Sequence, residues 1–156
     1  MIAINLICVG KIKEKFFVDA ICEYQKRLKS FCMLKIIELK ETNYSNPTKG
    51  EIEKIKEIEG KLILEKLTPN SVLLDVLGME KSSEEFAKSL EEAKQKTSEI
   101  TFVIGGSYGV SDEVKKKIGT KISFSRLTFP HQLMRVIFLE QLYRGFTINA
   151  NKTYHK

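Results

Sequence analysis

The sequence contains no tryptophan, only three prolines and nine glycines, and only three cysteines among its 156 residues. So little proline and glycine excludes a collagen-like chain and argues against a disordered, low-complexity chain. Cys8, Cys22 and Cys32 are odd in number, lack CxxC spacing and have no histidine near them. This pattern argues against a disulfide framework and against a zinc site. We therefore expect no metal, and we expect a reducing, cytoplasmic compartment.

Long apolar runs are also missing. The first residues, MIAINLICV, make a short apolar stretch before the first lysines, the reverse of the order in a secretory signal. No segment reaches the roughly 20 apolar residues that span a membrane. The composition is 42% hydrophobic and 29% charged, with no repeat and no linker. It predicts one soluble folded domain over residues 1–156, without membrane association.

Acidic residues are scarce at the two ends of the chain, which carries a formal charge of +6. Residues 1–40 hold 8 basic and 4 acidic residues, residues 41–124 hold 13 and 15, and residues 125–156 hold 5 and 1. The basic ends can form one face that binds a polyanion; the alternative is a surface charged only for solubility. The candidate residues of this face are Lys11, Lys13, Lys15, Arg126, Arg135, Arg144, Lys152 and Lys156.

Short apolar segments alternate with longer amphipathic ones, which predicts an α/β protein. The expected strands are residues 2–9, 33–40, 71–77, 100–104 and 120–124. The expected helices cover residues 15–29, begin after the capping residues Thr48, Ser82 and Ser111, and run from Pro130 to about Arg144. The second helix is expected to bury Ile52, Ile55, Ile58 and Leu62.

The last helix is apolar on more than one side. Eight of the eleven residues 133–143 are apolar, and they are distributed around the helix instead of forming one stripe. Such a helix is buried on two sides. In a chain of this size the second side predicts another subunit, so we expect a two-fold homodimer.

The glycine-rich segment 105–109 lies between an expected strand and a helix, at the edge of the sheet where α/β proteins bind ligands. Its spacing is G-G-x-x-G, which fits neither a dinucleotide fingerprint nor a P-loop. Small residues at this position let a ligand approach the backbone; a tight turn that needs positive φ is the alternative. Asp75 has no second carboxylate beside it, so paired-carboxylate chemistry finds no support.

Two further segments are candidate sites. His131 stands at the start of the last helix, where backbone donors and the positive end of the helix dipole are available, and it is either a packing residue or a catalytic one. The tail, residues 151–156, combines an aromatic ring, cations and an imidazole, which together can hold a nucleotide. The alternative is a frayed terminus with no function.

Four segments together resemble the ribosomal RNA large subunit methyltransferase H family, the smallest of the SPOUT class. They are residues 9–15 (VGKIKEK), residues 103–109 (VIGGSYG), residues 124–144 from FSRLTFPHQ to EQLYR, and Tyr154-His155-Lys156. The resemblance extends from the first residue to the last. It implies a SPOUT-type methyltransferase fold, a parallel-rich sheet flanked by helices with a C-terminal trefoil knot, and a homodimer.

The same resemblance implies transfer of a methyl group from S-adenosyl-L-methionine to N3 of a pseudouridine in helix 69 of 23S rRNA, on the assembled ribosome. The cofactor-binding residues that it implies are Leu74, Gly105, Phe124, Ser125, Arg126, Leu127, Thr128 and Phe129. Candidates for binding the acceptor base, stabilising its anion or relaying its proton are Arg144, Tyr154, His155 and Lys156. We expect the tail to clamp the nucleotide, with His155 as the proton relay.

The chain departs from the family pattern at residues 145–151, which bears on the details of RNA contact. Two alternatives remain at this point: a non-catalytic dimer of the same fold that binds RNA or the ribosome, and a SPOUT methyltransferase that acts on tRNA. The intact Gly105 and the intact segment 124–129 favour an enzyme, because a protein that only binds RNA does not need them.

Overall fold

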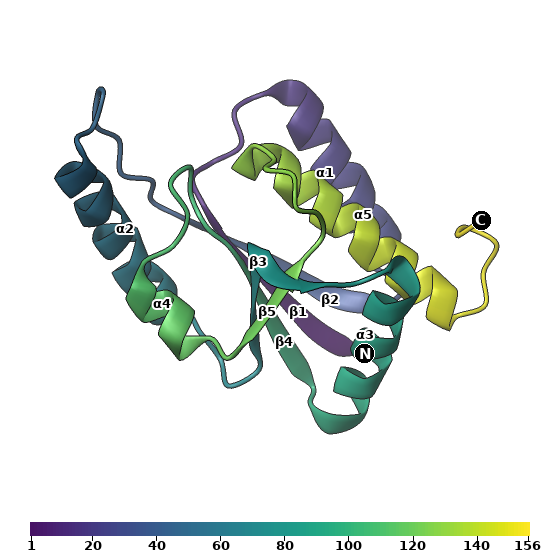
Figure 1. Cartoon of the computed structure of the whole chain (residues 1–156). Helices are drawn as coiled ribbons and strands as arrows, with labels where there is room; N and C mark the ends of the chain where they lie inside the picture. Colours follow the sequence, from purple (N-terminus) through teal and green to yellow (C-terminus); the bar gives the residue numbers. More distant parts are fainter.

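The computed structural model describes residues 1–156, which form a parallel five-stranded sheet between two layers of helices (Figure 1). The strand order is β2-β1-β4-β3-β5, and every neighbouring pair is parallel. The α/β prediction is therefore confirmed. The strands are β1 (Ile2–Val9), β2 (Cys32–Leu39), β3 (Ser71–Glu80), β4 (Glu99–Ile104) and β5 (Thr120–Ser123).

Helices cover both faces of the sheet, as parallel sheets require. The helices are α1 (Lys15–Leu28), α2 (Lys49–Leu64), α3 (Ser83–Lys96), α4 (Asp112–Lys117) and α5 (His131–Asn149). Helices α1, α3 and α5 pack on one face over the larger apolar cluster, and α2 and α4 pack on the other over the smaller one. Successive side chains of β1 point to opposite faces, so Leu6 joins the larger cluster and Ile7 the smaller.

The helix starts agree with the sequence because capping is a local property. Thr48 accepts a hydrogen bond from the backbone N–H of Glu51, and the Glu51 carboxylate accepts one from the N–H of Thr48. Ser82 and Glu85 repeat the same pair, and Ser111 accepts from the N–H of Val114. All three predicted caps are confirmed.

The buried side of α2 was predicted wrongly at one position. Ile58 is 44% exposed, whereas Ile55, Glu59, Gly60 and Ile63 are buried. The reason is a close approach to the start of α4: a Cβ on Gly60 would lie 2.5 Å from the Ser111 hydroxyl oxygen. This contact turns the Glu59–Gly60 side of α2 inward.

The ends of the other elements shift by small amounts, but α5 differs more. It begins at His131, with Pro130 just outside it, and continues to Asn149 instead of ending near Arg144. Gly145 allows this continuation beside α3, because a Cβ there would lie 2.8 Å from a methyl carbon of Leu90.

None of the helices combines the length and apolar character that a membrane-spanning helix needs, and all three cysteines are free.

Arg135 does not belong to a basic surface, contrary to the sequence prediction. It is 2% exposed; its Nη1 donates to the Glu38 carboxylate at 2.7 Å and its Nη2 to the carbonyl of Gly10 at 3.0 Å. Glu38 also accepts from the N–H of Ile12 at 3.2 Å. Arg135 therefore fixes the start of α5 to the ends of β1 and β2.

Substitution of Glu38 tests this contact. In Glu38→Ala the buried guanidinium loses its counter-ion, and we expect a loss of about 3 kcal/mol in the free energy of unfolding. Glu23→Ala removes an exposed helical ion pair with Arg27 and is the matched control, for which we expect a much smaller loss because solvent screens the pair. Denaturant unfolding measures both; equal losses would show that the Arg135 contact is not what holds α5.

Candidate functional site

A cavity of about 840 Å³ opens at the carboxyl ends of β3, β4 and β5. Parallel sheets bind ligands at this edge. Half of the residues that line the cavity are apolar, and the charged residues among them are Asp75 and Lys115. The lining comes from the end of β3 (73–77), the glycine loop (104–107, 109 and 110), Lys115 of α4, the segment 122–131 without Arg126, and Met134 of α5.

The glycine loop owes its shape to the absence of side chains. A Cβ on Gly105 would lie 2.8 Å from a methyl carbon of Val110, and a Cβ on Gly106 would lie 2.8 Å from the Glu59 carboxylate. Gly109 has φ of +83°, a left-handed conformation that favours glycine, and its N–H donates to the carbonyl of Gly106. The backbone of this loop is therefore presented directly to the cavity.

The segment that follows β5 forms the opposite wall. Phe124 stacks against Phe138 of α5 and meets Phe86 of α3 edge-on, so its ring faces the larger apolar cluster. The Ser125 hydroxyl accepts from the N–H of Leu127 at 3.0 Å, and Ser123 donates to the carbonyl of Ser125 at 2.8 Å. These contacts fix the backbone of the wall.

The end of β3 bends around the cavity mouth. Its pairing with β5 shifts register between Leu74 and Met79, and the intervening residues bulge outward. Asp75 closes the bulge by accepting from the N–H of Leu77 at 3.0 Å. Gly78 crosses β5 so closely that a Cβ would lie 2.6 Å from the backbone of Ile122. Leu77 is left 86% exposed at the rim.

His131 connects α5 to the glycine loop. Its Nδ1 lies 3.4 Å from the Ser107 hydroxyl oxygen, and its Nε2 lies 4.0 Å from the Glu41 carboxylate. Burial lowers the pKa of the imidazole below its ordinary value; Glu41 opposes this shift and Arg135 adds to it. The neutral ring is therefore favoured beside the cavity.

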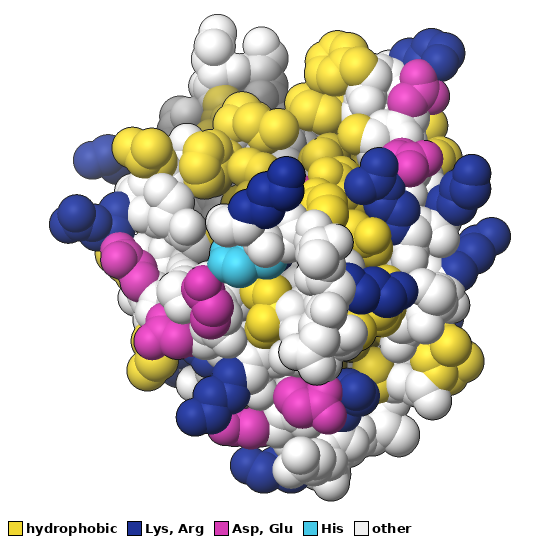
Figure 2. Space-filling view, turned by 90° about the vertical axis from the view of Figure 1, so that its right-hand side faces the viewer, with side chains coloured by type: hydrophobic (Ala, Val, Ile, Leu, Met, Phe, Trp, Pro, Cys, Tyr) yellow, Lys and Arg dark blue, Asp and Glu magenta, His cyan; other side chains and the backbone are white.

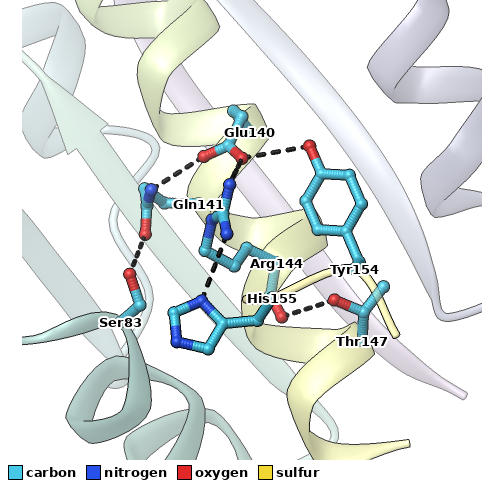
Figure 3. Close-up of polar contacts among 7 residues, drawn as sticks. All are labelled: Ser83, Glu140, Gln141, Arg144, Thr147, Tyr154 and His155. Atoms are coloured by element: carbon cyan, nitrogen blue, oxygen red, sulfur yellow. Dashed lines mark hydrogen bonds and ion pairs between the residues drawn. The ribbon is translucent and has the colours of Figure 1, made fainter. Parts of the chain in front are cut away.

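The tail packs against the far end of α5 (Figure 3). The Glu140 carboxylate accepts from Arg144 Nη2 at 2.7 Å, from the Tyr154 hydroxyl at 3.1 Å and from Gln141 at 2.7 Å. Arg144 Nη1 lies 3.1 Å from Nδ1 of His155. The tail is thus held by side-chain hydrogen bonds and is not a frayed end.

This network indicates which tautomer a neutral His155 ring adopts. A guanidinium can only donate, so Nδ1 accepts from Arg144 and a neutral ring carries its proton on Nε2. That nitrogen lies 2.8 Å from the carboxylate of Glu84, in the first turn of α3. Burial raises the pKa of Tyr154 to about 12, and Tyr24 and Glu140 contribute to the increase. Tyr154 is therefore a hydrogen-bond donor and not a base at neutral pH.

The whole chain matches a known family. Residues 2–155 match the family model described as predicted SPOUT methyltransferase. The ribosomal RNA large subunit methyltransferase H of Ligilactobacillus salivarius is 50% identical over 157 residues, which cover 98% of this chain and 99% of that protein. The proteins of the same name from Lactobacillus acidophilus and Clostridium perfringens are 48% and 50% identical, with the same coverage. The chain belongs to the ribosomal RNA large subunit methyltransferase H family.

A solved structure adds support for the fold of this SPOUT methyltransferase. A probable methylase family protein from Haemophilus influenzae Rd KW20 matches 99% of this chain and 70% of its own, with a TM-score of 0.51 and 13% identity. At that identity the likeness supports the fold alone. The resemblance carried by the four sequence segments is confirmed, and so is the fold class; the path of the knot stays a prediction.

The structure brings most of the expected cofactor residues of the methyltransferase to one cavity. Leu74, Gly105 and five residues of the segment 124–129 line it. The exception is Arg126, which is 88% exposed and points away, 3.4 Å from the carboxylate of Glu80. The bulge of β3 and Lys115 were not expected from the sequence, because neither is marked by a motif.

The expected catalytic residues lie elsewhere in the chain. Arg144 is thirteen residues beyond His131 on α5, which corresponds to about 20 Å along a helix. Figure 1 shows the tail beyond the far end of α5. Within one chain, the cavity and the group Arg144, Tyr154 and His155 are therefore two separate sites. No group of three or more His, Cys, Asp or Glu side chains is placed to hold a metal ion.

His131 gives this site a pH dependence. Its pKa is lower in the folded protein than the ordinary value of about 6.5, so the unfolded chain binds more protons below that pH. Stability from this group is present above pH 6.5 and is lost as the pH falls. Between pH 7 and pH 5.5 we expect the melting temperature of His131→Gln to fall less than that of the unaltered protein. Parallel slopes in thermal unfolding across this range would contradict the assignment.

Proposed function

We propose that the protein transfers a methyl group from S-adenosyl-L-methionine to N3 of a pseudouridine in helix 69 of 23S rRNA, on the assembled ribosome in the cytoplasm. The observation that carries the proposal is the cavity in which Leu74, Gly105 and the segment 124–129 meet. These are the residues through which the family resemblance assigns the cofactor. Residues 1–156 act as one SPOUT domain in this proposal.

The cavity fits the cofactor by its size and its chemistry. Backbone groups of Gly105 and of the segment 124–129 would hold the adenosine part, between apolar side chains that exclude water. Asp75 and Lys115 offer one charge of each sign, which suits the amino and carboxylate groups of a methionine moiety. When bound, the cofactor supplies a methyl group whose bond to sulfur breaks with the electron pair remaining on sulfur, while a bond forms to N3.

The acceptor N3 must lose its proton in this reaction, and the tail supplies groups for that task. Arg144 and Tyr154 donate hydrogen bonds and would stabilise the developing anion of the base. His155 is the candidate base: Nδ1 can accept the N3 proton once it is released from Arg144. Lys156 follows as a cation for a neighbouring phosphate.

We propose further that the active site is formed by two chains of a homodimer. Arg144, which the tail contacts, lies about 20 Å along α5 from His131 at the cavity, too far for methyl donor and acceptor to meet within one chain. Leu77, Met79 and Leu127 are exposed near the cavity mouth, and Leu133, Val136 and Ile137 of α5 are only partly buried. Figure 2 shows apolar side chains gathered on one face of the molecule. A second copy would cover this surface and bring its tail to the cavity.

A labelling experiment tests the substrate. The protein is supplied with S-adenosyl-L-methionine carrying a labelled methyl group, and with whole ribosomes, free 23S rRNA or tRNA. We expect label in the 23S rRNA of ribosomes, and little or none on free RNA, because the target is presented by the ribosome. Label on tRNA alone would contradict the substrate assignment, and ribosome binding without label would favour a non-catalytic binder.

A mixing experiment tests the shared site. The first variant, Gly105→Val, has a blocked cavity and an intact tail, because even a Cβ at position 105 is too close to Val110. The second variant lacks residues 153–156, so it has an intact cavity and no tail. Each variant alone should be inactive. Co-expression should restore about a quarter of the activity, since half of the randomly paired dimers combine one intact cavity with one intact tail. A mixture as inactive as its components would overturn the two-chain site, and full turnover by the deletion variant would overturn the role of the tail.

A further inference from the structure

Glu59 is the only acidic residue buried in the protein, and neither the cavity nor the tail cluster contains it. It lies in the third turn of α2 and is 3% exposed, yet it forms no ion pair. Burial raises the pKa of its carboxyl group, and the nearby charge of Glu41 raises it further. An acid in this position costs stability unless it satisfies a specific contact.

The Glu59 carboxyl group lies between two loops at the same edge of the sheet. Its Oε2 accepts a hydrogen bond from the N–H of Thr42, in the loop after β2, at 3.0 Å. Its Oε1 faces Gly106, in the loop after β4, where a Cβ would lie 2.8 Å away. One side chain of α2 therefore spans from the loop after β2 to the underside of the glycine loop.

The next residue of α2 supports the other end of the glycine loop. Gly60 packs against Ser111, which ends that loop and caps α4 through the N–H of Val114. Glu59 and Gly60 thus contact the glycine loop near its beginning and at its end. On the cavity side, His131 lies between Ser107 and Glu41, so the same two loops are also connected above the carboxyl group.

We propose that Glu59 is a positioning residue that holds the backbone of Gly105 and Gly106 in the geometry required for cofactor binding. This inference rests on the proposed function. The glycine loop has no side chain to anchor itself at these two positions, so its position must be set by what lies beneath it. Glu59 has the length to reach Gly106 and the acceptor that Thr42 requires. An apolar residue of similar size would leave the N–H of Thr42 without this partner.

Three variants separate positioning from general stability. Glu59→Gln keeps the length and an acceptor, Glu59→Ala removes both, and Ile63→Val alters a buried residue of the same helix that packs in the smaller apolar cluster. Affinity for S-adenosyl-L-methionine is measured by calorimetry, and KM for the cofactor, KM for ribosomes and kcat are measured in the methylation assay. Amide NMR shifts of Gly105, Gly106 and Ser107 are recorded without cofactor.

We expect Glu59→Ala to weaken cofactor binding about tenfold and to raise KM for the cofactor equally, because a loosened site loses pre-organisation. KM for ribosomes and kcat at saturating cofactor should not change, and the amide shifts of the glycine loop should move. Glu59→Gln should restore cofactor affinity to within about twofold of the unaltered protein, and Ile63→Val should leave it unchanged.

Several results would overturn the inference. These are unchanged cofactor affinity in Glu59→Ala, equal weakening by Ile63→Val, or glycine-loop amide shifts that do not respond to Glu59. Failure of Glu59→Gln to restore affinity would also overturn it, because the amide retains the shape and the acceptor. If the unaltered protein binds no S-adenosyl-L-methionine, the proposed function fails, and the amide shifts alone then decide whether Glu59 sets the loop.

Discussion

The buried contact of Arg135 decides where the last helix lies. Arg135 is in the second turn of α5, and its guanidinium reaches Glu38 at the end of β2 and the carbonyl of Gly10 after β1. A buried cation needs a counter-ion and hydrogen-bond acceptors; Arg135 has both through Nη1 and Nη2, and only its Nε is without a partner. The start of α5 is therefore held over the carboxyl edge of the sheet, where His131 meets the glycine loop. The direction of the helix then carries its far end toward α3, where the tail packs.

Because α5 is a rigid spacer, it separates two environments of different chemistry. At its start, the cavity is lined by backbone and apolar groups, with Asp75 and Lys115 as its charged members. At its end, Glu140, Arg144 and His155 form a charged network with Glu84 of α3. Methyl donors need dry, shaped pockets, whereas an RNA base that loses a proton needs donors and an acceptor. The proposed dimer brings these two environments together without bending the helix.

Much of the fold could be predicted from the sequence because its signals are local. The caps at Thr48, Ser82 and Ser111 depend on residues three positions apart, and the strands follow from short apolar runs. The burial of Arg135 could not be predicted, since its partner is 97 residues away and the sequence gives it the appearance of a surface cation. The bulge after Leu74 and the inward turn of Glu59 depend equally on contacts between distant segments.

The glycine loop shows why a buried acid belongs in this protein. Gly105 and Gly106 keep the cavity wall free of side chains, but the same absence removes any anchor that the loop could supply. Rigidity must then come from neighbouring elements, and α2 supplies it with two adjacent residues, one without a side chain and one with a long polar side chain. A hydrophobic residue at position 59 would be less costly to bury, but it offers no acceptor to Thr42. The cost of burying the carboxyl group is thus the consequence of a cavity wall built from backbone.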